Sequence, residues 1–121
     1  MLFVSAPYSS STPAVVEDRV RAVEDACAWL KMAGYLPLSP VAHWHRPAFR
    51  NGLPTNALAW TEWNREWLRA ADGLVVLQID GWRDSQGVAM EVKWARDAGM
   101  AIWPIGISGG KFLWAGGEEK Y

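Results

Sequence analysis

The run from Gly73 to Ile79 constrains the fold most, because its centre, residues 74–77 (Leu-Val-Val-Leu), is apolar at every position. A strand that is apolar on both faces must be covered on both sides, which is typical of a parallel sheet lying between helices. Similar short apolar runs occur at residues 2–5, 35–38 and 101–107. The pattern therefore predicts a buried, mainly parallel sheet of four to five strands.

Amphipathic segments alternate with these apolar runs. In residues 13–33, apolar side chains recur at steps of three and four, which predicts a helix with Thr12 as its N-cap and Gly34 at its end. Further helices are predicted over about residues 56–71 and after Asp84 or Ser85.

This alternation predicts a single α/β domain over residues 1–121, a Rossmann- or flavodoxin-like three-layer sandwich with right-handed crossovers. In such sheets the ligand lies beyond the carboxyl ends of the strands, where the strand order reverses. The loops after the first and third strands, residues 6–9 and 80–85, are therefore the expected site.

Three segments carry residues that break regular structure. Residues 39–55 contain several prolines and a glycine and are predicted to be a long irregular loop. The tail, with glycine pairs at 109–110 and 116–117, is also predicted to be a loop. Because Pro104 lacks an amide hydrogen, the strand at 101–107 is expected to be short or to lie at a sheet edge.

Composition excludes several classes of protein. The 12 basic and 13 acidic side chains give a net charge of −1, which disfavours binding of a nucleic acid polymer through bulk charge. A single cysteine, Cys27, cannot form an internal disulfide, so a cytoplasmic location is expected. No apolar run approaches the roughly 18 residues of a membrane span, and residues 1–4 do not resemble a signal peptide. His43 and His45 lack further ligands nearby, so neither a metal nor another cofactor is expected.

Nine tryptophans are many for a chain of this length, and Trp60, Trp63 and Trp67 recur at helical spacing. The simplest interpretation is packing within the fold. Large aromatic rings are also enriched at interfaces, so some of them can be buried between subunits.

Glu91 is the most informative polar residue. It follows Val88 by three positions and precedes Ala95 by four, at the margin of the helix face that must pack on the sheet. A carboxylate there is costly unless it is used or paired. The alternative, slightly favoured by spacing alone, is that Glu91 turns outward to pair with Lys93 or Arg96.

Other candidates lie close to the expected site. Ser85 and Gly87 begin the helix after a buried strand, which suits a phosphate, although a plain N-cap is common. Tyr8 follows the first strand and can orient the Glu91 carboxylate, or it is simply a half-buried loop aromatic. His43 can donate a proton to a leaving base, although exposed loop histidines without a role are more common.

Three stretches together resemble the nucleoside 2-deoxyribosyltransferase-like superfamily. They are residues 2–9 (Leu-Phe-Val-Ser-Ala-Pro-Tyr-Ser), residues 34–40 with the following His43, and residues 71–91, which end in Gly-Trp-x-x-Ser-x-Gly-x-x-x-Glu. The likeness extends to about residue 105 and is nearest to small, largely uncharacterised bacterial and phage members. The last motif is fairly specific and the first is weaker.

The resemblance implies that Glu91 attacks C1′ of the sugar, expels the base and forms a glycosyl-enzyme that water or a second base resolves. It implies that Tyr8 orients Glu91 and that Ser85 contacts the 5′-phosphate of a nucleotide. Members specialised for unphosphorylated nucleosides more often carry Asp-x-Gly at this place. The implied partner is therefore a nucleoside or nucleotide, and the implied substrate contacts are Ser5, Pro7, Ser9, His43, Asp80, Trp82, Ser85 and Gly87.

One position departs from the family pattern. Related enzymes carry an aspartate eight residues before the match to Asp72, where this chain has Asn64. Either Glu62 or Glu66 takes over the task, or base departure relies on His43 or on an amide such as Asn64, or the activity is reduced or absent. A shift of the alignment by one turn is a further alternative.

Superfamily members are commonly homo-oligomers whose subunits complete one another's pockets, so a homodimer or larger homo-oligomer is expected, and Tyr121 can reach a neighbouring pocket. The leading hypothesis is a nucleotide N-glycosidase or deoxyribosyltransferase. A nucleotide-binding sensor without chemistry is second. A structural α/β domain with a salt-bridged Glu91 is third.

Overall fold

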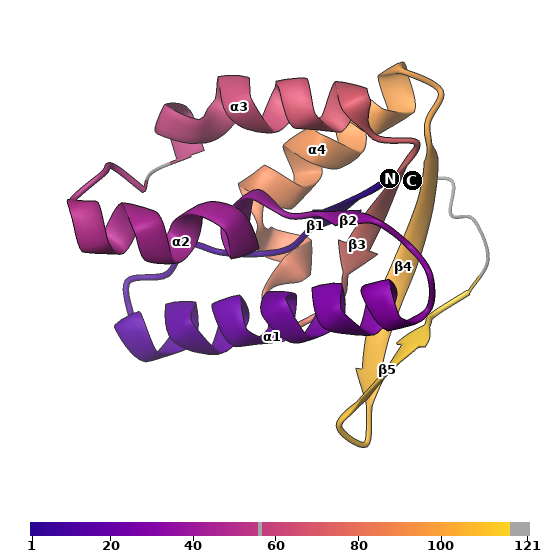
Figure 1. Ribbon diagram of the computed structural model, residues 1–121, viewed down its shortest axis with the longest axis horizontal. Coiled ribbons are helices and arrows are strands. Elements are labelled where there is room, and N and C mark those ends of the chain that lie inside the picture. The colour runs from indigo at the N-terminus through magenta and orange to yellow at the C-terminus, as the bar shows by residue number, and fades with distance from the viewer. Residues whose placement is uncertain (56, 117–121) are drawn as a thin grey trace.

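The computed structural model describes residues 1–55 and 57–116, apart from the side chains of residues 57 and 58. The elements, in chain order, are β1 (Leu2–Ser5), α1 (Pro13–Met32), β2 (Pro37–Leu38), α2 (Pro40–Asn51), α3 (Ala57–Ala70), β3 (Gly73–Leu77), the 3₁₀ helix η1 (Trp82–Asp84), α4 (Gln86–Asp97), β4 (Ala101–Ser108) and β5 (Lys111–Trp114). The sheet has the order β2-β1-β3-β4-β5, parallel except for the β4–β5 pair (Figure 1).

The sheet lies between two layers of helices. One core packs β-strand side chains against α3 and α4, and the other packs them against α1. Figure 1 shows α1 on the side of the sheet away from α3 and α4, and α2 beside α1. The predicted single-domain, three-layer α/β fold with a mainly parallel sheet is confirmed, and the strand order reverses between β1 and β3.

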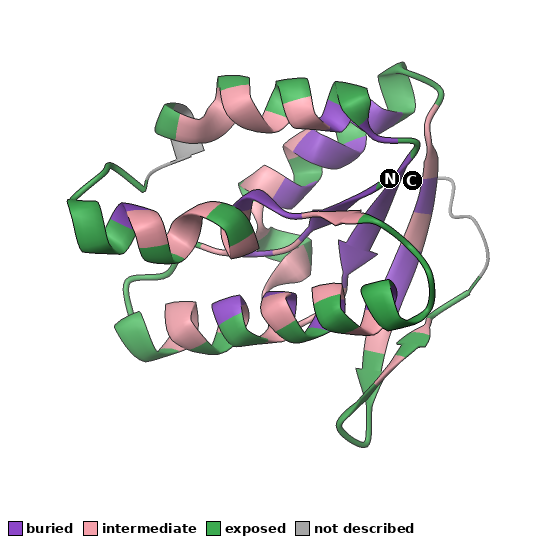
Figure 2. Ribbon diagram, in the orientation of Figure 1, coloured by how far each residue is buried: buried purple, intermediate pink, exposed green. Residues whose placement is uncertain are grey.

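The two faces of β1 explain how the fold brings a polar group to the core. All four residues of β1 are buried, as are all five of β3 (Figure 2). Phe3 packs into the core under α3 and α4, whereas Leu2 and Val4 pack into the core under α1. Because side chains alternate along a strand, Ser5 lies on the same face as Phe3 and points towards α4.

The first and last predicted helices begin where the sequence indicates. Pro13 is the first residue of α1 after Thr12, although the Thr12 side chain makes no capping hydrogen bond. Of the two candidate caps for α4, Ser85 holds the position, and its Oγ accepts a hydrogen bond from the Val88 amide at 3.2 Å.

The loop predicted over residues 39–55 is wrong for its central part, which forms α2. The Ser39 side chain caps this helix by accepting from the Ala42 amide at 3.0 Å, and Gly52 ends it with φ +66°. Pro47 inside the helix removes one amide hydrogen without ending the helix. The strand expected over 35–38 is correspondingly short and comprises only β2.

The C-terminal part of the described chain also differs from the prediction. Residues 109 and 110, both glycines with positive φ, make the turn of a hairpin that adds β5 to the sheet. Strand β4 is therefore internal, not an edge. Pro104 is tolerated because it lies just beyond the last hairpin pair, Ile105 with Trp114, and its carbonyl still accepts from the Ala115 amide. Of the second glycine pair, residue 117 lies outside the described residues, as does Tyr121.

No helix within residues 1–55 and 57–116 combines the length and the apolarity that a membrane crossing requires.

Candidate functional site

A cavity of about 510 Å³ lies at the carboxyl ends of β1 and β3, where the strand order reverses. Its wall comprises the loop after β1 (residues 6–9), the start of α4 (residues 84–87) and side chains of α1, α2 and α3. The loop after β1 and the Asp84–Ser85 end of the loop after β3 thus meet, as predicted from the fold class.

The Glu91 carboxylate lies at the inner wall of this cavity and is buried, with 7% of the residue exposed. Ser5 Oγ donates a hydrogen bond to Oε1 at 2.6 Å, and Asn64 Nδ2 donates to Oε2 at 3.5 Å. Burial raises the pKa of Glu91 to about 7, against the opposing effect of the Ser5 hydrogen bond. The outward-pairing alternative is wrong, since Lys93 pairs with Asp97 instead.

Each residue of this trio comes from a different element. Ser5 ends β1 on the face towards α4, and Glu91 lies on the buried face of α4. Asn64 precedes the buried Leu68 by one helical turn, so it lies on the inner face of α3. Asn64, the position that departs from the pattern of the superfamily that the sequence resembles, is therefore one of the two donors to Glu91.

The two acidic alternatives to Asn64 do not reach the site. Glu62 and Glu66 are exposed, and Glu66 pairs with Arg69 at 2.8 Å. Among the described lining residues, Asp84 is the carboxylate that accompanies Glu91 in the cavity.

Two buried polar atoms of cavity residues have no hydrogen-bond partner among the described residues. They are the amide oxygen of Asn64, an acceptor, and the indole Nε1 of Trp44, a donor. Buried polar atoms are rarely left unpaired in folded proteins. Both atoms have almost no accessible surface, so a bound molecule can pair with them only when these side chains turn towards it.

Tyr8 lines the cavity, but its predicted hydrogen bond to Glu91 is wrong. Its hydroxyl lies 2.8 Å from His45 Nδ1, and the two rings meet edge to face. Among the described residues, the hydrogen bonds to Glu91 come from Ser5 and Asn64. Ser5, predicted as a substrate contact, thus holds the place expected for Tyr8.

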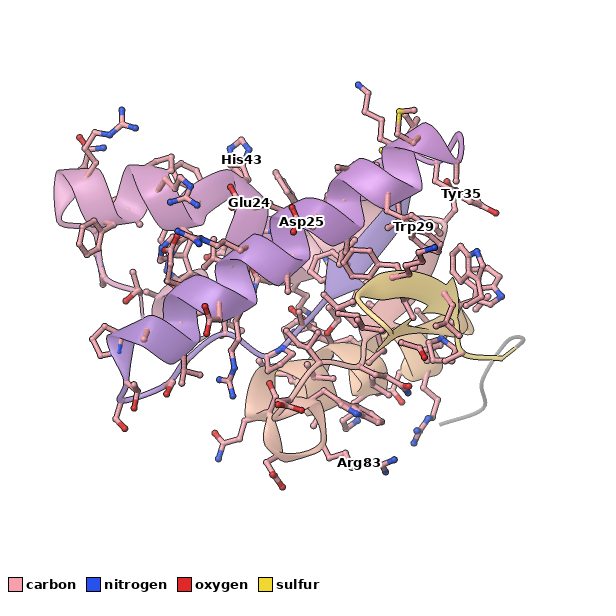
Figure 3. All side chains as sticks on the ribbon, turned by 90° about the horizontal axis from the view of Figure 1, so that it is seen from below. Glu24, Asp25, Trp29, Tyr35, His43 and Arg83 are labelled. Atoms are coloured by element: carbon pink, nitrogen blue, oxygen red, sulfur yellow. The ribbon has the colours of Figure 1, made fainter. Side chains whose placement is uncertain are left out.

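His43 is not part of the cavity wall, contrary to the prediction. It is exposed on α2 (Figure 3). Its ring packs against those of Trp44, Trp63 and Trp67. His45, two residues later, is half-buried and lines the cavity. Residues two apart differ in direction by about 200° around a helix, so α2 directs His43 and His45 to different sides.

The tryptophans of α2 and α3 pack together, as the spacing predicts. The Trp63 and Trp67 rings lie 5.0 Å apart, and the Trp44 ring lies 5.3 Å from both Trp60 and Trp63. Trp44 and Trp60 also line the cavity. This side of the site is therefore a rigid aromatic wall.

The opposite end of the cavity is polar. Pro7, Ser9, Ser85 and Gly87 line it as predicted, beside the first turn of α4. The sequence analysis missed Arg19, whose guanidinium donates to the carbonyl oxygens of Ser9 at 2.7 Å and of Asp80 at 3.4 Å.

Nothing in the spacing of α1 distinguishes Arg19 from other polar residues of that helix. A Cβ at Gly81 would lie 2.3 Å from Arg19 Nη2, so a side chain there would displace the guanidinium. The φ of Gly81 is +92°, a backbone conformation that favours glycine.

Two predicted substrate contacts lie elsewhere. Asp80 and Trp82 line a separate pocket of about 270 Å³ beside Arg83. The Trp82 ring packs against the core under α3 and α4, with the Arg83 guanidinium 4.7 Å from its centre. Figure 3 shows Arg83 pointing away from the fold.

Within the described part of the chain, no group of three or more His, Cys, Asp or Glu residues could hold a metal ion. A family model described as a domain of unknown function (DUF1937) matches residues 1–105. The matched range includes every residue of the cavity wall. No curated protein matches the chain.

Proposed function

The chain belongs to the DUF1937 family of domains of unknown function, and we propose that it cleaves or transfers the N-glycosidic bond of a nucleotide through a covalent intermediate on Glu91. The observation that carries this proposal is a buried carboxylate that faces a cavity of about 510 Å³ and is held by hydrogen bonds from Ser5 and Asn64. The substrate is a nucleoside 5′-phosphate, in the first instance a deoxynucleoside 5′-monophosphate. The resemblance to the nucleoside 2-deoxyribosyltransferase-like superfamily supports the same chemistry.

In the proposed reaction a Glu91 oxygen attacks C1′ as the bond from C1′ to the base nitrogen breaks. The bonding electrons leave with the base, which gains a proton, and an ester joins the sugar to Glu91. Water then attacks C1′ and releases the sugar phosphate, or a second base attacks and is glycosylated. Both steps regenerate the carboxylate.

The polar end of the cavity supports the choice of a phosphorylated substrate. The first turn of α4 carries free amide hydrogens and a partial positive charge, and Gly87 leaves the backbone uncovered there. Arg19 adds a full positive charge to this wall. Ser9 and Ser85 contribute hydroxyl groups that can donate to phosphate oxygens.

The aromatic wall supports a flat, apolar-faced group at the other end. Trp44, Trp60 and Tyr8 all line the cavity. A nucleobase offers both a face for ring contact and ring acceptors. We assign this wall to the base.

Asn64 takes the place of the superfamily aspartate in this proposal. Its amide nitrogen donates to Glu91, and its buried, unpartnered oxygen can accept from a sugar hydroxyl once the side chain turns towards the cavity. An amide cannot act as a general base or acid near neutral pH. Proton delivery to the base therefore falls to another group, of which Asp84, His45 and Tyr8 line the cavity.

The test is chromatographic. The purified protein and a Glu91→Gln variant are incubated with nucleosides and 5′-monophosphates, ribo and deoxy, with and without an acceptor base. We expect base release from monophosphates by the wild type alone, and exchange of bases if the protein is a transferase. Equal turnover by the variant, or turnover of unphosphorylated nucleosides only, contradicts the proposal.

A second candidate function is a nucleotide-binding sensor that does no chemistry. The amide at Asn64 and the pKa of Glu91, raised to about 7 by burial, both favour it, because a protonated carboxyl does not attack carbon. A nucleotide that raises the melting temperature and stays intact over long incubation would support this function.

The Asn64→Asp variant discriminates between the two candidates. If the amide is what prevents chemistry, the variant gains base release that the wild type lacks. If the wild type is already active, the aspartate lies beside Glu91, opposes its ionisation and shifts the activity to higher pH.

We also propose that the protein is cytoplasmic and assembles into a homodimer or a larger homo-oligomer. The free thiol of Cys27 suits a reducing compartment. Exposed apolar side chains such as Met32 and Phe49, 88% and 83% exposed, suit burial between subunits. Light scattering after gel filtration tests the assembly, and a monomeric mass contradicts it.

A further inference from the structure

We propose that His45, which lies beside Glu17, sets the direction of the hydrogen bond between its own ring and the Tyr8 hydroxyl. This direction decides whether the hydroxyl hydrogen of Tyr8 is available inside the cavity. Its catalytic consequence rests on the proposed function. Its geometry does not, because it concerns hydrogen bonds within the protein. Here His45 and Glu17 are positioning residues that act through Tyr8.

The three side chains form a chain that leads from the surface to the cavity. Glu17 lies on α1, and its Oε2 is 3.8 Å from Nε2 of His45 on α2. The other ring nitrogen, Nδ1, is 2.8 Å from the Tyr8 hydroxyl oxygen. The His45 side chain is only 12% exposed, and both His45 and Tyr8 line the cavity.

The direction of the hydrogen bond between Tyr8 and His45 follows from the state of the ring. A neutral imidazole carries one N–H, and a carboxylate near Nε2 favours the hydrogen on that nitrogen. Nδ1 then accepts, so the Tyr8 hydroxyl must donate to it. A protonated ring carries hydrogens on both nitrogens, so Nδ1 donates to the Tyr8 oxygen instead. The phenol keeps its own hydrogen and can turn it towards the cavity.

The charged groups around these three side chains come from α1 and α2. Arg46 on α2 and Arg21 on α1 lie 3.4 Å and 3.3 Å from Glu17 Oε1, the oxygen that does not face His45. Arg46 is also paired with Glu24 on α1 at 2.8 Å. The loop after β1 contributes Tyr8. The arginines hold Glu17 in place and leave its Oε2 for the imidazole.

The freed hydroxyl gives the proposed reaction a proton donor that Asn64 cannot supply. Tyr8 donates its hydrogen to the leaving base as the bond to C1′ breaks, and the phenol oxygen regains a hydrogen from Nδ1 of protonated His45. His45 then takes up a proton from solvent, so the proton count balances over one turnover.

The direct test needs no substrate. We would label the imidazole nitrogens with ¹⁵N and record the His45 signals against pH in the wild type, Tyr8→Phe, Glu17→Gln and the control Glu24→Gln. We expect one neutral tautomer, with hydrogen on Nε2, in the wild type and in Glu24→Gln. In Tyr8→Phe and Glu17→Gln we expect hydrogen on Nδ1 in part of the molecules. A wild-type ring with hydrogen mainly on Nδ1 overturns the proposal.

The second test uses base release. We would measure kcat and KM in the wild type and in Tyr8→Phe. Tyr8→Phe should lower kcat by about 10- to 100-fold, with KM nearly unchanged. An unchanged kcat in Tyr8→Phe overturns the proposal. If the wild type releases no base, the proposed function fails, and the tautomer of His45 still decides the proposal by itself.

Discussion

Glu91 and Glu17 are both glutamates, but their surroundings are opposite. Glu91 is buried at the end of the sheet, where its hydrogen bonds come from neutral side chains, and burial raises its pKa to about 7. Glu17 lies between α1 and α2 beside Arg46, Arg21 and His45. Desolvation raises the pKa of Glu17, but the charges and hydrogen bonds of the two arginines more than offset this and hold its pKa below the ordinary value.

The difference shows which of the two is set up for chemistry. A carboxylate placed among cations, as Glu17 is, contributes to stability when it is ionised. A carboxylate kept away from cations at the wall of a cavity costs stability whenever it ionises, which is typical of functional sites. The comparison therefore predicts opposite results when each charge is removed.

The largest effect is expected on activity from Glu91→Gln. Removing the nucleophile should lower base release by about 10³-fold or more. The measurement is the chromatographic assay with a deoxynucleoside 5′-monophosphate. The exposed Glu62→Gln on α3 is the matched control and should keep wild-type activity. A Glu91→Gln variant within tenfold of wild type would place the chemistry elsewhere.

The next largest effect of Glu91→Gln is on stability. The substitution lowers activity, but it should raise the free energy of unfolding relative to the wild type as the pH rises. The folded protein keeps the Glu91 proton up to about pH 7, whereas the unfolded chain releases it near 4.5. The folded state thus binds more protons in this window, so the free energy of unfolding falls as pH rises from 4.5 to 7. This loss amounts to about 3 kcal/mol.

Glu91→Gln should not show that loss, because glutamine does not titrate. Urea unfolding of wild type and variant at pH 4.5 and pH 8 measures it. The stability of the variant relative to the wild type should rise between the two pH values. A constant difference would contradict the raised pKa of Glu91.

Ser5→Ala tests the same comparison through the residue that donates a hydrogen bond to Glu91. At pH 8 the buried carboxylate loses its 2.6 Å donor, which should lower the free energy of unfolding by about 2 kcal/mol. The pKa of Glu91 should rise further, so the acid limb of the activity moves to higher pH. At pH 5, where Glu91 is neutral, the loss should be smaller. The exposed Ser108→Ala serves as control, and equal losses at both pH values would contradict this account.

The smallest effect is expected from Glu17→Gln. This carboxylate is partly exposed, so its ion pairs are weak and screened by salt. Its lowered pKa means that it stabilises the fold above its ordinary pKa and that this contribution disappears as pH falls through the lowered value. The melting temperature at pH 7 should fall less than in Ser5→Ala, and the difference should vanish in 1 M salt. A fall larger than that of Ser5→Ala would reverse the comparison.

Local patterns were sufficient to predict four of the five strands and three of the helices. The apolar run at residues 73–79 and the steps of three and four in α1 follow directly from burial. Helix α2 was missed because Pro47, Gly52 and Pro54 are typical of a loop, although Ser39 and Pro40 repeat the start signal of Thr12 and Pro13.

The same error in secondary structure explains the errors in the site. With residues 39–55 taken as a loop, His43 and His45 are equivalent, and only the helix assigns His45 to the cavity. The Ser5 contact to Glu91 joins residues 86 positions apart, which no local pattern reveals. Asn64 was found because it was located by counting from a motif, and its helix places it against Glu91.

Arg19 joins the two loops that frame the cavity, since one guanidinium holds Ser9 from the loop after β1 and Asp80 from the loop after β3. The two loops are therefore coupled through Arg19, and neither can move away without breaking its hydrogen bond to that side chain. The polar end of the cavity therefore acts as a fixed floor, and we expect its shape to change little when a molecule binds.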